Sequence, residues 1–247
     1  WKFADDITVS EIVNKSEQSA LQTDIDRTST WSRNNLFQLN PIKCKEMILS
    51  LTTPPAVYQL ISISNQRLER VTSIKCLGVI LTDDLKWTNH VNTITSKTSK
   101  RLYLLRQLKR ADVGNVDLVN FYCSCIRSVL KYACQLFHSA FPQYLVKDIE
   151  CIQKRAMRTI YPDVTYNDAL INAGISTLEN RRENLSCKLF DNIVSKDDHK
   201  LIKLLPSRTS NRYLRKDRTF EVPISNTNRF ENSFIIHYAK NIINNTF

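Results

Sequence analysis

Two adjacent carboxylates near the start of the sequence, Asp5 and Asp6, are the residues whose types and spacing best suit metal chemistry. They lie between short runs of residues that favour β-strands, so we expect a β-hairpin with the pair at its exposed tip. Because neighbouring side chains at a tip diverge, one carboxylate can bind a metal ion while the other supports the site. Mg²⁺ suits such a pair, since it takes one or two carboxylates and completes its shell with water and substrate phosphates. The pair is a candidate for half of a two-metal phosphoryl-transfer centre.

Acidic pairs in turns also have a purely structural explanation, because Asp accepts turn geometry and bonds to its own backbone. A second pair, Asp83 and Asp84, precedes a helix that we expect to begin near Thr88. We interpret this second pair as turn and helix-start residues rather than as metal ligands. For the first pair, the surrounding residues distinguish the two explanations.

Those surrounding residues resemble a known polymerase family. Phe3 to Asp6 resembles the aromatic-x-Asp-Asp box of reverse transcriptases. Trp31 and the run from Leu39 to Lys45 resemble the helix and strand that follow this box in the polymerases of non-LTR retrotransposons. Cys76 to Leu81, followed by Trp87 to His90, is similar to the Leu-Gly-Val strand and the Trp-x-x-His element ahead of the thumb. The chain therefore resembles the C-terminal part of a LINE-type reverse transcriptase of the jockey or CR1 kind, most weakly after about residue 200.

The resemblance implies an activity and roles for particular residues. The parent activity would be RNA-directed DNA synthesis, in which a primer 3′ hydroxyl attacks the α-phosphate of a nucleotide between two Mg²⁺ ions. Asp5 would bind metal, with Asp6 as its support in the same metal site. Lys43 matches the lysine that follows the box, a residue suited to neutralise departing pyrophosphate, and Lys45 competes for this role. The partners would be an RNA template and a DNA primer or duplex.

One departure from the family concerns what precedes the box. In the family, the other metal-binding Asp, the fingers and the nucleotide-selecting segment all come earlier, whereas only Trp1 and Lys2 precede Phe3 here. We therefore expect a partial sequence that does not polymerise by itself, and its status as an enzyme stays open. Two other interpretations remain. One is a non-catalytic remnant that binds nucleic acid, and the other is a helical scaffold whose basic residues pair with Asp and Glu.

An α+β scaffold is needed to position these residues. Residues 1–86 predict the C-terminal half of a polymerase palm, with a helix over 16–39 that Pro41 ends. Residues 87–195 predict an all-α helical thumb, and residues 196–247 a basic C-terminal extension. The antiparallel strands of the palm are expected at residues 45–51, 58–63, 67–71 and 75–81.

Gly78 falls inside the last of these apolar strands. Glycine weakens a strand unless another backbone approaches it closely or the strand bulges. The resemblance places this strand in the primer-grip region, so close approach of a nucleic-acid strand is one explanation and a β-bulge is the other.

Basic residues gather on the first helix of the predicted thumb. Apolar residues from Val91 to Leu108 recur at steps of three and four, which predicts an amphipathic helix. No acidic residue lies between positions 97 and 110, and this one-sided charge suits contact with phosphates, although a merely soluble basic face is the other explanation. The candidate nucleic-acid contacts, with two from a later helix, are Lys97, Lys100, Arg101, Arg106, Lys109, Arg110, Lys154 and Arg158.

Further helices are expected after this one. A seam from Val119 to Ala140 predicts a single helix, and a face from Leu145 to Ile160 predicts another that packs against it. A short helix over 167–173 should end at Gly174 as a left-handed cap. The remaining helices are expected over residues 177–194 and 234–243.

Composition limits the classes of partner and compartment. Lys and Arg outnumber Asp and Glu by 35 to 24, which gives a net charge of +11 and favours nucleic acid over a membrane as the partner. No apolar run approaches the roughly 18 residues of a membrane span, and no signal-peptide pattern begins the sequence, so we expect an intracellular protein, nuclear or cytoplasmic.

Seven cysteines at irregular spacing predict reduced thiols. Cys123, Cys125, Cys134 and His138 are interpreted as structural, since residues two apart on a helix face different ways.

Overall fold

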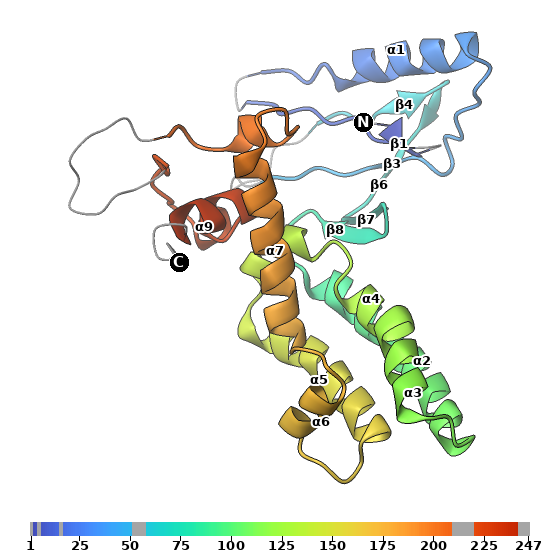
Figure 1. The fold of residues 1–247 in the computed structure, drawn as a ribbon. Coiled ribbons are helices and arrows are strands. Elements are labelled where there is room, and N and C mark those ends of the chain that lie inside the picture. Colours follow the sequence, from blue (N-terminus) through green and yellow to red (C-terminus); the bar gives the residue numbers. More distant parts are fainter. Residues whose placement is uncertain (1, 4–5, 15–16, 51–57, 209–219, 242–247) are drawn as a thin grey trace, which may run out of the picture. The chain divides into compact units, whose positions relative to one another are not determined.

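The computed structural model describes residues 2–3, 6–14, 17–50, 58–208 and 220–241. The chain divides into two compact units, Trp1–Asn89 and His90–Phe247, and each is described by itself. In the described residues, the first unit combines short strands with helix α1 (Leu21–Asn34), whereas the second is mostly helical (Figure 1). The expected mixture of helices with small sheets is therefore confirmed, while the assignment of palm and thumb stays a prediction.

The first unit begins with the expected hairpin. Strand β1 (Lys2–Phe3) pairs in antiparallel fashion with β2 (Asp6–Ile7), and Phe3 lies opposite Asp6. Asp6 is exposed at the start of β2, and Asp5 lies outside the described residues. The expected hairpin is therefore present, although Asp6 belongs to its second strand rather than to its tip.

Helix α1 (Leu21–Asn34) is shorter than the expected helix over 16–39. It ends well before Pro41 because Leu36 adopts a left-handed backbone, with φ of 58°. The N–H of Phe37 then bonds to the carbonyl of Ser32 at 2.9 Å, and the N–H of Leu36 bonds to that of Arg33 at 3.2 Å. This pattern closes a helix without any help from proline, so the expectation that Pro41 ends the helix was wrong.

The described strands of this unit pair two by two instead of forming one sheet. Strand β3 (Lys45–Glu46) pairs in parallel with β6 (Glu69–Arg70), contrary to the antiparallel arrangement expected for a palm. Strand β4 (Ser62–Ile63) forms an antiparallel hairpin with β5 (Gln66–Arg67). The expected strands were too long because turns interrupt the runs of β-favouring residues.

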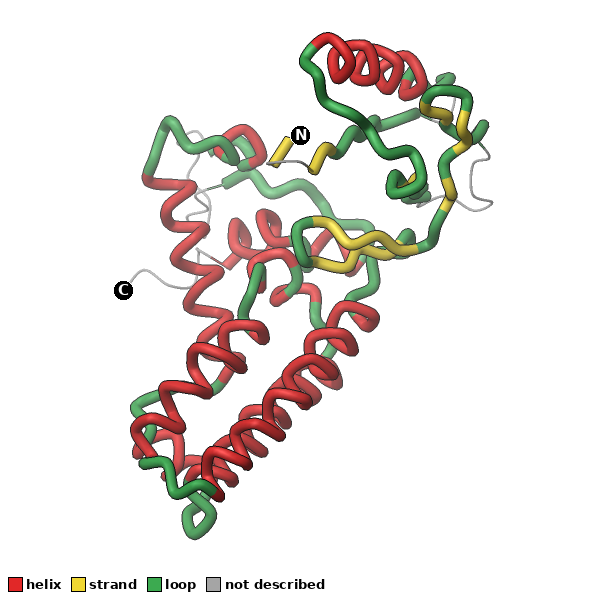
Figure 2. Tube along the Cα trace, turned by 90° about the vertical axis from the view of Figure 1, so that its right-hand side faces the viewer, coloured by secondary structure: helices red, strands yellow, loops and turns green. Residues whose placement is uncertain are grey.

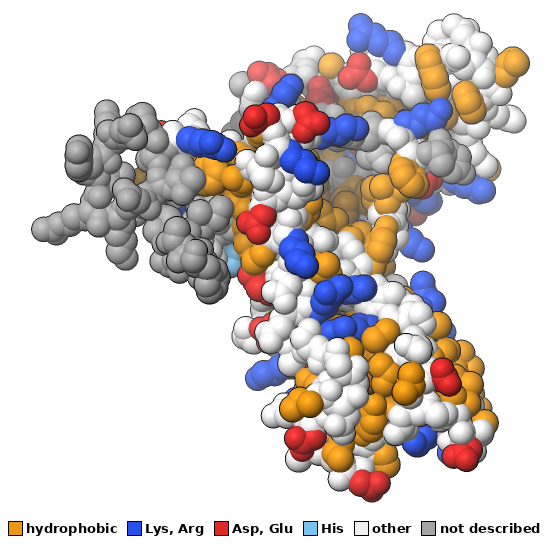
Figure 3. All heavy atoms as spheres, in the orientation of Figure 1, with side chains coloured by type: hydrophobic (Ala, Val, Ile, Leu, Met, Phe, Trp, Pro, Cys, Tyr) orange, Lys and Arg blue, Asp and Glu red, His pale blue; other side chains and the backbone are white. Residues whose placement is uncertain are grey.

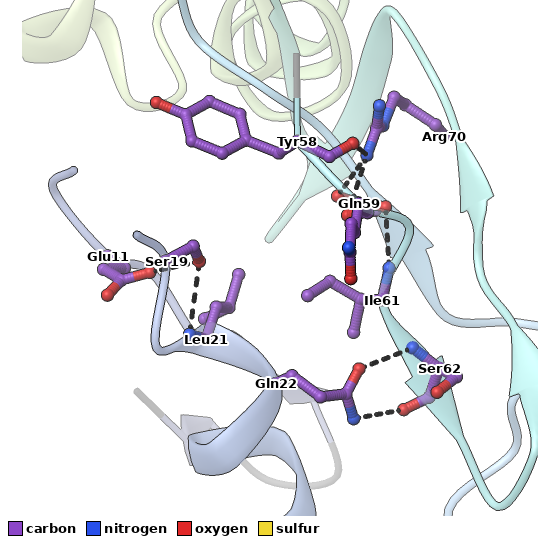
Figure 4. Close-up of polar contacts among 10 residues, drawn as sticks. Glu11, Ser19, Leu21, Gln22, Tyr58, Gln59, Ile61, Ser62 and Arg70 are labelled. Atoms are coloured by element: carbon purple, nitrogen blue, oxygen red, sulfur yellow. Dashed lines mark hydrogen bonds and ion pairs between the residues drawn. The ribbon is translucent and has the colours of Figure 1, made fainter. Parts of the chain in front are cut away.

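Helix α1 packs on β4 to form the core of the first unit. Ile61, Ile63 and Leu68 are buried there, against Leu21 and Ile25 of the helix. The contact also has a polar component that Figure 4 shows. The side-chain amide of Gln22 accepts from the N–H of Ser62 and donates to its carbonyl, both at 2.9 Å. Nearby, Arg70 Nη2 donates to the carbonyls of Tyr58 and Gln59 at 3.0 and 3.1 Å.

Gly78 lies in a turn and not inside a strand, which corrects the expectation for this residue. Strands β7 (Ser73–Cys76) and β8 (Val79–Thr82) form an antiparallel hairpin joined by Leu77 and Gly78. Both of these residues have positive φ, 46° and 86°. A two-residue hairpin turn of this kind needs positive φ at both positions, and this requirement explains the glycine. Neither a β-bulge nor the approach of nucleic acid is needed.

In the second unit, α2 (Thr88–Arg110) leads through a tight turn to α3 (Asn115–Phe121), as Figure 2 shows from the side. The chain continues as a π-helical segment (Tyr122–Arg127) and a last turn, α4 (Ser128–Leu130). The single helix expected as far as Ala140 was wrong. Ala133 has φ of 51°, and two 3₁₀ turns follow, Cys134–Leu136 and His138–Ala140.

The later helices agree with the sequence. They are α5 (Gln143–Ile160), α6 (Tyr166–Asn172) and α7 (Leu178–Ser195). Gly174, with φ of 62°, caps α6 as expected, and the N–H of Ile175 bonds to the carbonyl of Leu170 at 3.0 Å. A 3₁₀ turn (Ile202–Leu204), α8 (Asn228–Glu231) and α9 (Phe234–Asn241) follow. A separate small core there buries Phe190, Phe220, Tyr238 and Ala239.

Candidate nucleic-acid interface

The predicted metal site lies partly within the described residues. Asp6 is exposed, and Asp5 is outside the described ranges. Lys43 is exposed in a turn, where its backbone N–H donates to the carbonyl of Asn40 at 3.1 Å. Lys45, the rival for the role of Lys43, forms an ion pair with Glu69 instead. Over the part of the chain that is described, no hydrogen bond or ion pair joins Asp6 to Lys43. No group of three or more His, Cys, Asp or Glu side chains suited to a metal is found there.

The second acidic pair acts as the sequence predicts, as part of a turn. Asp84 accepts a hydrogen bond from the Thr82 hydroxyl at 2.7 Å and from the N–H of Lys86 at 3.0 Å. The Lys86 ammonium lies 2.9 Å from its other oxygen. These contacts, the Lys86 side chain first, lower the pKa of Asp84 to about 2. The carboxylate is therefore fully used within the turn before α2.

Helix α2 separates an apolar side from a basic side. Val91, Ile94, Leu102 and Leu105 are buried, with Thr98 between them. Four of the six predicted contacts on this helix are exposed on the rest of its surface: Lys97, Lys100, Arg106 and Arg110. This division follows from the steps of three and four in the sequence.

The other two cations of α2 have partners within the helical unit. The guanidinium of Arg101, half-buried, donates to the carbonyl of Cys125. Cys125 belongs to the π-helical segment, where the wider turn interrupts the regular bonding of an α-helix, and Arg101 supplies a donor. Lys109 Nζ lies 3.0 Å from Asn115 Oδ1, across the turn between α2 and α3. These two residues therefore stabilise the helix pair.

Three arginines from two helices line one hollow. Arg106 of α2 meets Arg155 and Arg158 of α5 around a space of about 190 Å³, which Leu102 and Thr159 also line. Arg155 is not among the predicted contacts, although its spacing of three residues before Arg158 places both on one helix face. Lys154, which was predicted, has its Nζ 5.5 Å from the ring of Tyr166 in a cation–π contact.

Within the described residues, none of the eight predicted contacts forms an ion pair with a carboxylate. Among the described residues of the helical unit, the ion pairs are His138 with Glu183 at 2.9 Å and Lys240 with Glu231 at 3.0 Å. On the face of this unit that Figure 3 shows, Lys and Arg side chains lie among Asp and Glu side chains. The scaffold interpretation requires the basic residues to be paired, and this condition is not met in the part of the chain that is described.

A buried polar network fixes α5, which carries two of the three arginines. Gln153 is fully buried and accepts from the Tyr122 hydroxyl at 2.5 Å. Its amide donates to the Tyr166 hydroxyl at 2.9 Å and to the Ser176 carbonyl at 3.1 Å. Burial raises the pKa of Tyr122 and of Tyr166, so both hydroxyls stay protonated donors. Glu150 completes the network by accepting from Tyr166 and from the N–H of Leu178.

A second polar cluster joins α7 to α9. Glu183 accepts from the Tyr238 hydroxyl at 2.9 Å, and His138 Nε2 lies 2.9 Å from the same oxygen. The contact with His138, followed by those with Tyr238 and Cys187, lowers the pKa of Glu183 to about 2. Cys187 donates to Glu183 at 3.4 Å, and its pKa rises to about 11 because of burial and this carboxylate. All seven cysteines have free thiols.

Comparison with known proteins yields one family. Residues 87–128 match the model of a family described as alkylated DNA repair protein alkB homolog 8, N-terminal. The matched stretch covers α2, α3 and the π-helical segment, and it is too small a share of the chain to assign membership. The searches among curated proteins and among solved structures found no match. No described helix is long and apolar enough to cross a membrane.

Proposed function

We propose that this chain is the C-terminal part of a reverse transcriptase of a non-LTR retrotransposon, and that its helical unit binds nucleic acid. The single observation that carries the binding role is the set of cations on α2 and α5 that lack carboxylate partners within the described residues. The sequence resemblance around Asp5, Asp6 and Trp87 supports the polymerase assignment. The partial match to a family described as a DNA repair protein covers α2 and supports the same class of partner.

The acidic pair has the chemistry expected of a magnesium site in this proposal. Asp6 is exposed and forms no ion pair over the described ranges, so its carboxylate is available to a metal. With Asp5 beside it, the site offers the one or two carboxylates that Mg²⁺ takes from protein. Mg²⁺ held there would stabilise negative charge on a phosphate during nucleotidyl transfer. Lys43, exposed in its turn, is free of the ion pair that occupies Lys45.

Binding by the helical unit would depend on charge more than on base sequence. Lys97, Lys100 and Arg110 are exposed on α2, and cations of this kind neutralise phosphates without reading bases. Each neutralised phosphate releases counterions, so affinity falls by about 0.9 log units per log unit of salt for each contact on B-DNA. Three contacts would contribute about 2.7 to this slope.

The test replaces Lys97, Lys100 and Arg110 together with Gln, which keeps helix propensity nearly constant. The control replaces Lys188, Lys196 and Lys203 together with Gln. These lysines are also exposed, and their replacement removes the same number of charges from α7 and the segment after it. Affinity for a fluorescent primer-template duplex is measured across a series of salt concentrations.

The α2 variant should bind with a slope reduced by up to about 2.7, which is up to about 500-fold in affinity at 0.1 M salt. The control should keep most of the parent's affinity. Equal losses in both variants, or a parent chain that does not bind, would show that the helical unit has no nucleic-acid interface on α2.

A further inference from the structure

The hollow between α2 and α5 is lined by three arginine side chains, and such a lining suits an anionic ligand. Arg106 Nε donates to the carbonyl of Leu102 at 3.4 Å, which leaves its two terminal nitrogens as donors to another group. Arg155 and Arg158 lie one helical turn apart on α5, so their side chains are neighbours. Leu102 is 2% exposed and gives the hollow an apolar wall.

No carboxylate of the described residues pairs with the charges around this hollow. Its lining contains no carboxylate, and none of its three arginines forms an ion pair within the described residues. Three like charges around a space of about 190 Å³ repel one another unless an anion lies between them. The Thr159 hydroxyl donates to the carbonyl of Arg155 at 3.0 Å, so the guanidinium groups are the available donors.

These donors suit a phosphate with three free oxygens. A guanidinium binds two oxygens through its planar fork, and arginine is preferred wherever phosphate is recognised in this way. A phosphodiester within a strand has two free oxygens and one charge. A terminal phosphate has three free oxygens and a charge near −2, which matches three arginines better.

We infer that this hollow binds the terminal phosphate of a nucleic-acid strand. The inference rests on the proposed role in nucleic-acid binding and names the part of the ligand that α5 recognises. It assigns Arg155 a role beside Arg106 and Arg158, and it separates this site from the exposed cations of α2, which contact phosphates along a strand.

The experiment compares duplexes of one sequence that end in a 5′ phosphate or in a 5′ hydroxyl. The parent chain should bind the phosphorylated duplex about tenfold more tightly, the effect of roughly one additional charge-assisted hydrogen bond. A variant with Arg155→Lys and Arg158→Lys keeps the charge but loses the fork. It should lose the preference for phosphate, so that the ratio of its affinities for the two duplexes falls to about one. Arg155→Gln with Arg158→Gln should lose the preference and lower the salt slope as well.

A variant with Lys188→Gln and Lys196→Gln is the charge-matched control and should keep the preference. Inorganic phosphate and a nucleoside monophosphate, added as competitors, distinguish a strand end from a free phosphate. If the strand end is the ligand, both should compete only at concentrations far above that of the duplex. Equal affinity of the parent for the two duplexes would overturn the inference, as would a preference that survives in both arginine variants. Because binding of the hydroxyl duplex is measured in the same series, failure of the terminal-phosphate site is distinguishable from failure of nucleic-acid binding as a whole.

Discussion

Gln153→Leu should destabilise the helical unit because it leaves the buried hydroxyl of Tyr122 without its acceptor. Gln153 is fully buried and is the acceptor for the hydroxyl of Tyr122, which is also fully buried. The other partners of Gln153 keep a bond without it. Arg127 Nη2 still donates to the Ser176 carbonyl at 2.8 Å, and Tyr166 still donates to Glu150. The substitution therefore leaves the Tyr122 hydroxyl as the new unpaired group.

The expected cost follows from this count. A buried donor left without an acceptor costs about 1–3 kcal/mol, and the leucine fills a similar volume. Tyr122→Phe alone should cost a similar amount, because it leaves the Gln153 carbonyl oxygen without that donor. The double variant removes both partners, so it should be more stable than the sum of the two single losses predicts, by about 1–2 kcal/mol.

The assay is urea unfolding of the parent, the two single variants and the double variant, monitored by the circular dichroism signal of the helices. The slope of unfolding free energy against urea concentration must be the same for all four proteins. Losses that simply add in the double variant would refute the reasoning, because they would mean that the two side chains do not stabilise each other. The same variants can be tested for duplex binding, since the network fixes the helix that carries Arg155.

Three further predictions concern single residues. Arg101→Gln should cost about 1.5–3 kcal/mol of stability through the lost bond to the Cys125 carbonyl, with little change in the salt slope of duplex binding; a lower slope at unchanged stability would contradict this. Glu183 has its pKa lowered to about 2 from 4.5, so its contribution to stability is present above about pH 4.5 and is lost as pH falls toward 2, and unfolding measured over this range should lose that pH dependence in Glu183→Gln. Gly174→Ala should cost about 1–2 kcal/mol from backbone strain alone, because φ is 62° and the added methyl group meets no atom within 4 Å, and a neutral result in thermal unfolding would exclude the left-handed cap.

Local signals in the sequence determined much of the helical unit. The apolar steps predict the buried side of α2 and nearly the whole of α5, and Gly174 predicts where α6 ends. These features depend on residues within one or two turns of each other, so a sequence is sufficient to find them. The exposed cations of α2, Lys97, Lys100, Arg106 and Arg110, follow from the same pattern, because they fall between the buried positions.

The spacing of apolar residues gave a wrong prediction where an α-helix and 3₁₀ turns bury residues at similar steps. The expected seam to Ala140 continued through a helix that in fact ends at Leu130. Beyond that point Cys134 of the first 3₁₀ turn and Phe137 between the two turns are buried, while Leu136, which the seam predicted to be buried, is 57% exposed. A 3₁₀ turn repeats every three residues, so steps of three do not distinguish it from an α-helix.

The tertiary structure decided which partner each side chain meets. Six cations on α2 look equivalent in the sequence, yet Arg101 bonds to the π-helical backbone, Lys109 bonds to Asn115, and Arg106 joins the hollow with Arg155 and Arg158. A helical pattern reports the direction in which a side chain leaves its own helix, but not the group on the neighbouring helix. That group depends on how the helices pack, because residues distant in sequence become neighbours only when the chain folds.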